Sequence, residues 1–201
     1  MLGRLRLALW IAAGLAVAAF AVLQLNEPRP GNSGNGLPGQ ALIGGPFELT
    51  AHTGERFDNK TRLAGRNHLV FFGFTHCPDI CPTTLNEISE HLDKLGTAAD
   101  GLEVLFITVD PERDTPQHLA TYLSSFDKRI TGLTGTTAQI ASVLKLYRAF
   151  AEKVPTSSGD YTMNHTATVY LFDGAGSLRS TLTFQEPQGI RQGKIDRLVK
   201  G

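Results

Sequence analysis

The sequence predicts an α/β fold, a central mixed sheet flanked by helices, preceded by one N-terminal transmembrane helix. Leu69–Phe74 and Glu103–Val109 are continuous apolar runs, as expected of strands that are covered on both faces. Segments with a helical apolar period follow these runs, and such alternation favours an α/β layer. The membrane helix is predicted because Leu7–Leu25 contains no charged residue.

Composition excludes several classes of protein. The 201 residues include 19 Lys+Arg and 19 Asp+Glu, so the formal net charge is zero, which argues against a nucleic-acid binder. Hydrophobic residues make up 41% of the chain, which argues against disorder. A body of roughly 160 residues needs no disulfide or metal to fold. Two cysteines are too few for a disulfide-stapled mini-protein.

The apolar segment Leu7–Leu25 is predicted to be a membrane anchor. As a helix it would span about 28 Å, close to the ~30 Å hydrocarbon core of a bilayer. Arg4 and Arg6 precede it, so we expect residues 1–6 to stay cytoplasmic and the body to be exported. The alternative is a cleaved signal peptide. Two Ala-x-Ala segments resemble cleavage sites, but they lie inside the apolar run, which favours the uncleaved anchor.

Residues 26–40 are dominated by Pro, Gly and Asn and contain no apolar period. They are predicted to be a flexible linker with a reach of about 20 Å. Residues 41–201 would then form one domain, held on the periplasmic or exported side of the inner (cytoplasmic) membrane.

The body is predicted to begin with a hairpin, Phe47–Thr50 and Glu55–Phe57, that turns at Gly54. The later elements follow from apolar periods, caps and turns. In chain order they are the strand 69–74, a helix with a stripe at Leu85, Ile88, Leu92 and Leu95, the strand 103–109, a helix begun by Thr115 and Pro116, a helix with a stripe at Ile140, Val143, Leu144 and Tyr147, the strand Thr166–Phe172 with its partner Ser177–Phe184, and a helix over Ile190–Val199.

Cys77 and Cys81 lie between the first buried strand and its helix, which suggests a thioredoxin-like arrangement. Because proline disfavours the helical conformation of the preceding residue, we expect the helix to begin at Pro82 with Cys81 as its N-cap. The positive end of the helix would then favour the Cys81 thiolate. Two converging thiolates select Cu(I), Zn(II) or iron–sulfur clusters, and two cysteines are too few for such a cluster within a monomer. An inert structural disulfide is disfavoured, because so short a ring adds little stability.

A third ligand would have to come from elsewhere in the chain. Of six histidines, His165 stands immediately before a predicted strand whose end can face the cysteines. It is either a ligand or a hydrogen-bonded loop histidine. Asp110 follows the second buried strand at the sheet edge where α/β sites gather. It either orients a ligand or partner, or belongs to a turn in which Asp114 or Thr115 caps the next helix.

Nearly the whole body, about residues 44–200, resembles the Sco/SenC family of membrane-anchored copper chaperones. The matching segments are Gly44–Phe47, the cysteine loop Phe72–Pro82, the acidic turn Val109–Thr115, Gly132–Gly135 and the distal His165.

The resemblance implies a thioredoxin-like fold and copper, as Cu(I), Cu(II) or both, bound by Cys77, Cys81 and His165. Family members assist assembly of the CuA centre in a subunit of cytochrome c oxidase, by delivering copper, by reducing that subunit's cysteines, or by both. The resemblance therefore implies a metallochaperone rather than an enzyme. Two rival hypotheses remain: a thiol–disulfide oxidoreductase in which Cys77 attacks, and a thiol peroxidase in which one cysteine becomes a sulfenic acid that the other resolves.

Overall fold

A computed structural model describes Arg6, Trp10, residues 43–157 and residues 159–200. Ala41–Gly201 forms one compact unit, which contains every element discussed below. Apart from Trp10, the predicted anchor 7–25 and the predicted linker 26–40 lie outside the described residues. Among the helices that are described, none combines the length and the apolar character that crossing a membrane requires.

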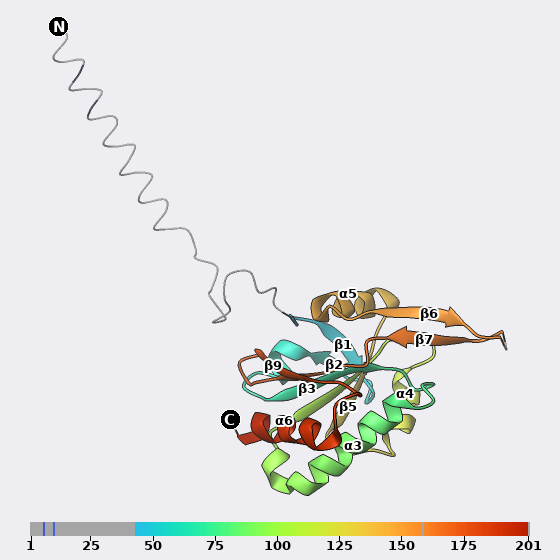
Figure 1. Cartoon of the computed structure of the whole chain (residues 1–201). Helices are drawn as coiled ribbons and strands as arrows, with labels where there is room; N and C mark the ends of the chain where they lie inside the picture. The colour runs from blue at the N-terminus through green and yellow to red at the C-terminus, as the bar shows by residue number, and fades with distance from the viewer. Residues whose placement is uncertain (1–5, 7–9, 11–42, 158, 201) are drawn as a thin grey trace. The chain divides into compact units, whose positions relative to one another are not determined.

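The described strands form a central mixed sheet in the order β2–β1–β5–β4–β3–β8–β9 (Figure 1). β3, β4 and β5 run parallel to one another, and the other neighbours in the sheet are antiparallel. The predicted N-terminal hairpin is confirmed, since Leu49 of β1 pairs with Phe57 of β2. The bounds are β1 Glu48–Ala51, β2 Arg56–Asp58, β3 His68–Gly73, β4 Glu103–Thr108, β5 Ile130–Thr134, β8 Val169–Phe172 and β9 Leu178–Leu182.

Helices cover both faces of this sheet (Figure 1). On one face, the Tyr147 ring of α5 packs against Phe72 of β3 at 5.4 Å between ring centroids. On the opposite face, Phe106 of β4 packs against Tyr122 of α4 at 5.9 Å. The helices are α2 Asn59–Arg62, α3 Ile80–Leu95, the 3-10 turn η1 Gly96–Ala99, α4 Pro116–Leu123, α5 Thr137–Tyr147 and α6 Gln188–Lys200.

The core is centred on β3 and β4. Every residue of β3 is buried, and so is every residue of β4 except its first, Glu103. This confirms the prediction of two strands covered on both faces. It also means that the residues that follow these parallel strands leave the core at one edge of the sheet, where their loops lie side by side.

Three strands were not predicted. β5 follows α4, and β6 (Ala151–Pro155) pairs with β7 (Tyr161–His165) in a separate two-stranded sheet that stands out from the body (Figure 1). The strand predicted over Thr166–Phe172 begins only at Val169. β6 has no buried residue, so it carries no apolar alternation from which a strand could be predicted.

Gly73, the last residue of β3, lets the next helix approach the sheet closely. A Cβ at this position would lie 2.5 Å from the Phe106 ring and 2.9 Å from the sulfur of Cys81. Both neighbours are fully buried and cannot easily move. Only glycine therefore allows the first turn of α3 to pack against the end of β3.

We expect Gly73→Ala to lower the free energy of unfolding by about 1–3 kcal/mol, because the added methyl group overpacks the core. Urea unfolding measures the change. The control is Gly101→Ala, where a Cβ would meet open space and the expected change is within about 0.5 kcal/mol. Equal unfolding midpoints for the two variants would contradict the close approach described here.

Candidate metal centre

The cysteine loop leaves β3 at Gly73 and turns back into α3. Cys77 lies in this loop and is partly exposed, whereas Cys81 lies in the first turn of α3 and is buried; both are free thiols. The backbone N–H of Cys81 donates to the Cys77 sulfur at 3.4 Å, which holds the loop against the helix. The two sulfurs are thus brought together by local structure.

The prediction that α3 begins at Pro82 is wrong. The helix begins at Ile80 with Asp79 as its N-cap, so Cys81 is a helical residue. Pro82 is tolerated because backbone N–H groups in the first turn have no acceptor within the helix, so a missing N–H costs little there.

His165 reaches the cysteines from the far end of the chain. It is the last residue of β7 and pairs with Ala151 of β6. Its Nδ1 lies 3.1 Å from the carbonyl oxygen of Thr166, which can only accept, so Nδ1 carries the proton. Nε2 then presents a lone pair, and it lies 3.8 Å from the Cys81 sulfur. The ring also stands edge-on to Phe74, with centroids 5.6 Å apart.

Cys77, Cys81 and His165 thus form one group whose three ligand atoms all lie within 4.8 Å of one another. Two sulfurs and one imidazole nitrogen make a soft ligand set, which suits copper or zinc. The histidine is oriented as metal-binding histidines usually are, because its second ring nitrogen donates to a backbone carbonyl.

The two thiols differ in acidity. The pKa of Cys77 is lowered, chiefly because the Cys81 thiol donates a hydrogen bond to its sulfur, while partial burial opposes this effect. The pKa of Cys81 is raised, because its proton is held by that same hydrogen bond and because the side chain is buried. The prediction that the Cys81 thiolate forms more easily than that of a free cysteine is therefore wrong. It is Cys77 whose thiolate forms more easily.

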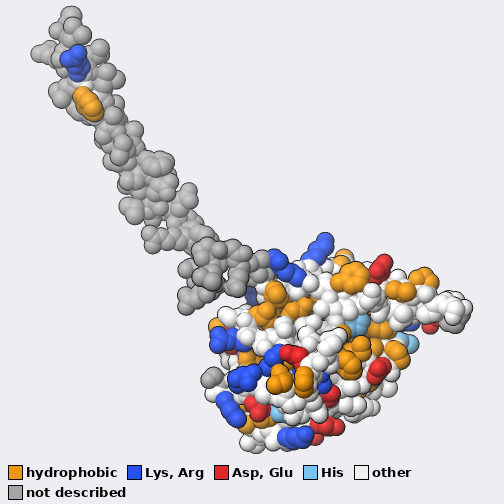
Figure 2. Space-filling view, in the orientation of Figure 1, with side chains coloured by type: hydrophobic (Ala, Val, Ile, Leu, Met, Phe, Trp, Pro, Cys, Tyr) orange, Lys and Arg blue, Asp and Glu red, His pale blue; other side chains and the backbone are white. Residues whose placement is uncertain are grey.

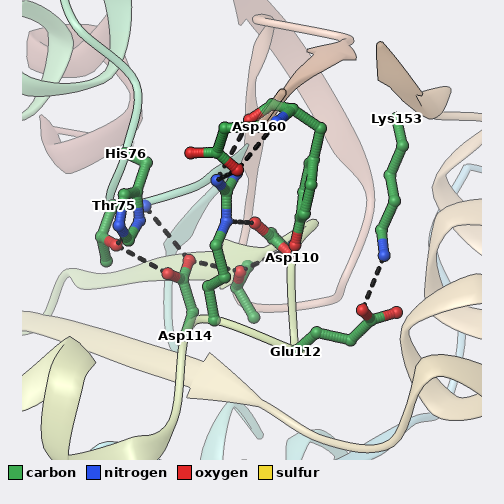
Figure 3. A network of polar contacts seen from close by, with 10 residues as sticks. Thr75, His76, Asp110, Glu112, Asp114, Lys153 and Asp160 are labelled. Carbon is green, nitrogen blue, oxygen red and sulfur yellow. Dashed lines mark hydrogen bonds and ion pairs between the residues drawn. The ribbon is translucent and has the colours of Figure 1, made fainter. Parts of the chain in front are cut away.

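Asp110 is buried, and within the described part of the chain no hydrogen bond or ion pair joins it to any of these three residues. Its carboxylate accepts a hydrogen bond from the Tyr161 hydroxyl at 2.9 Å and pairs with Arg113 (Figure 3). Asp114, also buried, is the carboxylate that reaches the cysteine loop, where it accepts from the Thr75 N–H at 3.1 Å. Thr115 is the N-cap of α4. Sequence reasoning missed the Asp114–Thr75 contact, because nothing in the sequence relates residues so far apart.

Arg113 links this acidic turn to the β6–β7 hairpin. Its guanidinium carbon lies 3.8 Å from the centroid of the Tyr161 ring, and Nη1 donates to the Tyr161 carbonyl at 3.0 Å. A second link joins Lys153 of β6 to Glu112 at 2.7 Å (Figure 3). Since His165 ends the same hairpin, these contacts hold its strand beside the cysteine loop.

The fold and this group define a class: a thioredoxin-like α/β domain with a Cys-x-x-x-C pair and a distal histidine that could hold a soft metal ion. The SCO1/SenC family profile matches residues 35–200. The chain belongs to the SCO1/SenC family.

Curated relatives agree with this membership. The chain is 42% identical over 141 residues to the human mitochondrial SCO1 homolog, covering 69% of this chain and 46% of the relative. It is 39% identical over 163 residues to the SCO2-like protein RP587 of Rickettsia prowazekii, covering 79% of each. The chain therefore spans about half the length of the human relative and most of the bacterial one.

Solved structures show the same fold. Bradyrhizobium japonicum ScoI, determined with copper bound, is 49% identical with a TM-score of 0.71, over 78% of this chain and 99% of that one. Yeast Sco1, also determined with copper bound, is 36% identical with a TM-score of 0.72, over 80% and 90% of the two chains.

The acidity difference predicts how the thiols react. In the reduced, metal-free chain we expect iodoacetamide to alkylate Cys77, because the thiolate is the nucleophile. The rate of alkylation should rise at a lower pH than it does for an ordinary thiol, because the pKa of Cys77 is lowered. Cys81→Ala removes the donated hydrogen bond and should move the rate profile to higher pH, whereas Cys81→Ser keeps a donor and should move it less. Identical profiles in both variants would refute this cause.

The Asp110–Arg113–Tyr161 contacts predict unequal losses of stability. Arg113→Ala leaves the buried Asp110 carboxylate without its cation and should lower the free energy of unfolding by about 3 kcal/mol. This is the lower end of the range for breaking a buried ion pair, because Arg113 keeps some contact with water. Tyr161→Phe removes one hydrogen bond and should cost about 0.5–1.5 kcal/mol. Urea unfolding ranks the two, and the reverse order would contradict the assignment.

Proposed function

We propose that this chain is a copper chaperone that binds copper through Cys77, Cys81 and His165 and helps to assemble the CuA centre of cytochrome c oxidase. The observation that carries the proposal is the convergence of the three ligand atoms within 4.8 Å. The copper-bound relatives support it, because they share the fold at 49% and 36% identity. Copper is the cargo, and the protein is a carrier rather than an enzyme.

The ligand set suits both oxidation states of copper. Thiolates favour Cu(I), and imidazole is also a good ligand for Cu(II). Because the pKa of Cys77 is lowered, one thiolate is available at neutral pH before any ion arrives. The second thiol must lose its proton when the ion binds, so binding should release a proton.

The position of the group suits transfer to another protein. Cys77 is partly exposed, so incoming ligands can reach the ion held there. Val154, with an exposed fraction of 38%, belongs to the hairpin that carries His165, and Phe150, with an exposed fraction of 50%, immediately precedes it. Figure 2 shows hydrophobic side chains gathered near histidines on part of the described surface. We propose that the CuA-bearing subunit of the oxidase docks on this surface.

A second candidate function is thiol–disulfide exchange on the same subunit. It is favoured by the contrast between an accessible thiolate at Cys77 and a buried thiol at Cys81. Cys77 would attack a disulfide of the partner to give a mixed disulfide. Cys81 would then attack the Cys77 sulfur, so that the partner leaves as a dithiol and Cys77–Cys81 is oxidised to a disulfide.

One experiment separates the two functions. The copper-loaded chain is mixed with a CuA-bearing domain whose cysteines are either reduced or joined in a disulfide. A copper carrier forms the CuA centre, which is measured by its absorption, with the reduced partner. A reductase instead converts the oxidised partner to its dithiol, and it does so even when this chain is used in its copper-free, reduced form. Thiol titration of the partner measures that conversion.

We also propose that residues 7–25 anchor the chain in the inner membrane, that 1–6 stay cytoplasmic, and that the linker 26–40 holds the domain 41–201 on the exported side. The support is the uncharged apolar run preceded by Arg4 and Arg6. We expect the full chain to stay with membranes in alkaline carbonate, and a chain lacking residues 1–25 to be released. Equal release of both chains would exclude the anchor.

His165→Ala tests the ligand set. Losing one of three ligands should weaken copper binding by more than the roughly 10–100-fold that loss of an outer hydrogen-bond partner costs, while the reactivity of Cys77 with iodoacetamide remains. Competition with a chelator measures the affinity, and the thiolate-to-Cu(II) absorption band reports the remaining ligands. The control is His52→Ala, which lies outside the group and contacts Gly132. Wild-type affinity in His165→Ala would exclude this histidine as a ligand.

A further inference from the structure

A second group of potential metal ligands lies beside the cysteine loop. His76, Asp114 and His118 each offer one ligand atom, and these atoms lie within 4.8 Å of one another. His76 precedes Cys77 in the loop, Asp114 follows β4, and His118 lies in the first turn of α4. None of the three belongs to the Cys77–Cys81–His165 group.

Asp114 is fully buried, yet no lysine or arginine in the described part of the chain pairs with it. Its oxygens accept from the Thr75 N–H, from the Thr75 hydroxyl at 2.6 Å and from the Thr108 hydroxyl at 2.6 Å (Figure 3). An ionised carboxylate offers about four lone-pair positions, so one on Oδ1 remains free. A buried anion without a cation is costly, and a bound metal ion would offset that cost.

The Thr75 hydroxyl also orients the His76 ring. Its single proton goes to Asp114, because a carboxylate can only accept. The His76 Nδ1, 3.1 Å from the same hydroxyl oxygen, must therefore be the donor in their contact. Nε2 of His76 is then unprotonated and free to bind a metal. A carboxylate, a hydroxyl and an imidazole in sequence resemble the outer hydrogen bonds that orient metal-binding histidines.

His118 lies against His76. Their rings are stacked, with centroids 5.4 Å apart and an angle of 9° between the planes. The backbone of His118 is fixed, because its N–H donates to the hydroxyl of Thr115, the N-cap of α4. Both rings are exposed, so small rotations of the two side chains can bring their nitrogens onto one ion over the Asp114 carboxylate.

We propose that His76, Asp114 and His118 form a second metal site, one residue away from Cys77, and that its ligand is divalent copper. Two imidazole nitrogens and one carboxylate oxygen, with no thiolate, suit Cu(II) rather than Cu(I). Among divalent first-row metals, such a site binds Cu(II) most tightly. The site does not rest on the proposed function of the thiolate group, because it shares no ligand with that group.

The test removes the thiolate group first. In the full-length chain carrying Cys77→Ser, Cys81→Ser and His165→Ala, we expect one equivalent of Cu(II) to remain bound through gel filtration. Its electron paramagnetic resonance spectrum should show hyperfine coupling to two nitrogens. Adding His118→Ala should weaken Cu(II) binding by about tenfold or more and leave coupling to one nitrogen.

Gln117→Ala on the same helix is the matched control and should change neither the affinity nor the spectrum. His76→Gln is a second test at the other exposed ring and should weaken binding as His118→Ala does. The proposal is overturned if the triple variant retains no Cu(II), or if His118→Ala binds Cu(II) as tightly as Gln117→Ala. Failure here leaves the thiolate group untouched, since that group is absent from every chain in the test.

Discussion

Two buried carboxylates in the turn after β4 hold the candidate metal centre together. Asp114 accepts two hydrogen bonds from Thr75 and so fixes the start of the cysteine loop. Asp110 pairs with Arg113 and accepts from Tyr161, and so fixes the hairpin that carries the histidine. Both carboxylates follow a strand that is buried along nearly its whole length, so their hydrogen bonds tie two segments outside the central sheet to the rigid core.

The sequence was informative wherever burial dictates residue type. The apolar runs of β3 and β4 and the caps of α4 predicted those elements correctly, because both signals are local. β5 was missed because it is short and contains Gly132, where a Cβ would lie 2.5 Å from Leu123. The β6–β7 hairpin was missed because it is exposed and is held by Arg113 and Lys153 through contacts that no local pattern reveals.

In the candidate site, too, the local features were predictable from the sequence and the features that depend on distant contacts were not. The cysteine pair was evident from spacing. His165 was preferred as a ligand only through the resemblance to a family, and the structure brings its Nε2 to 3.8 Å from the Cys81 sulfur. Easier formation of the Cys81 thiolate was predicted, and this is wrong, because the prediction placed Cys81 at the N-cap and not inside the helix. With α3 starting at Ile80, Cys81 is buried inside the first turn and its thiol donates to Cys77, and both effects raise the pKa of Cys81.

The arrangement also bears on how an ion could be both held and released. Of the three candidate ligands, Cys77 lies in the loop after β3 and Cys81 in the first turn of α3. His165 ends a hairpin that forms its own sheet and shares no strand pairing with the central one. Displacing the hairpin would break the contacts of Arg113 and Tyr161 but no hydrogen bond of the central sheet. Arg113 keeps some exposure to water, so a docking protein could reach its side of these partly buried contacts. If copper binds as proposed, such a displacement would remove His165 and leave Cys77 and Cys81 as its remaining ligands.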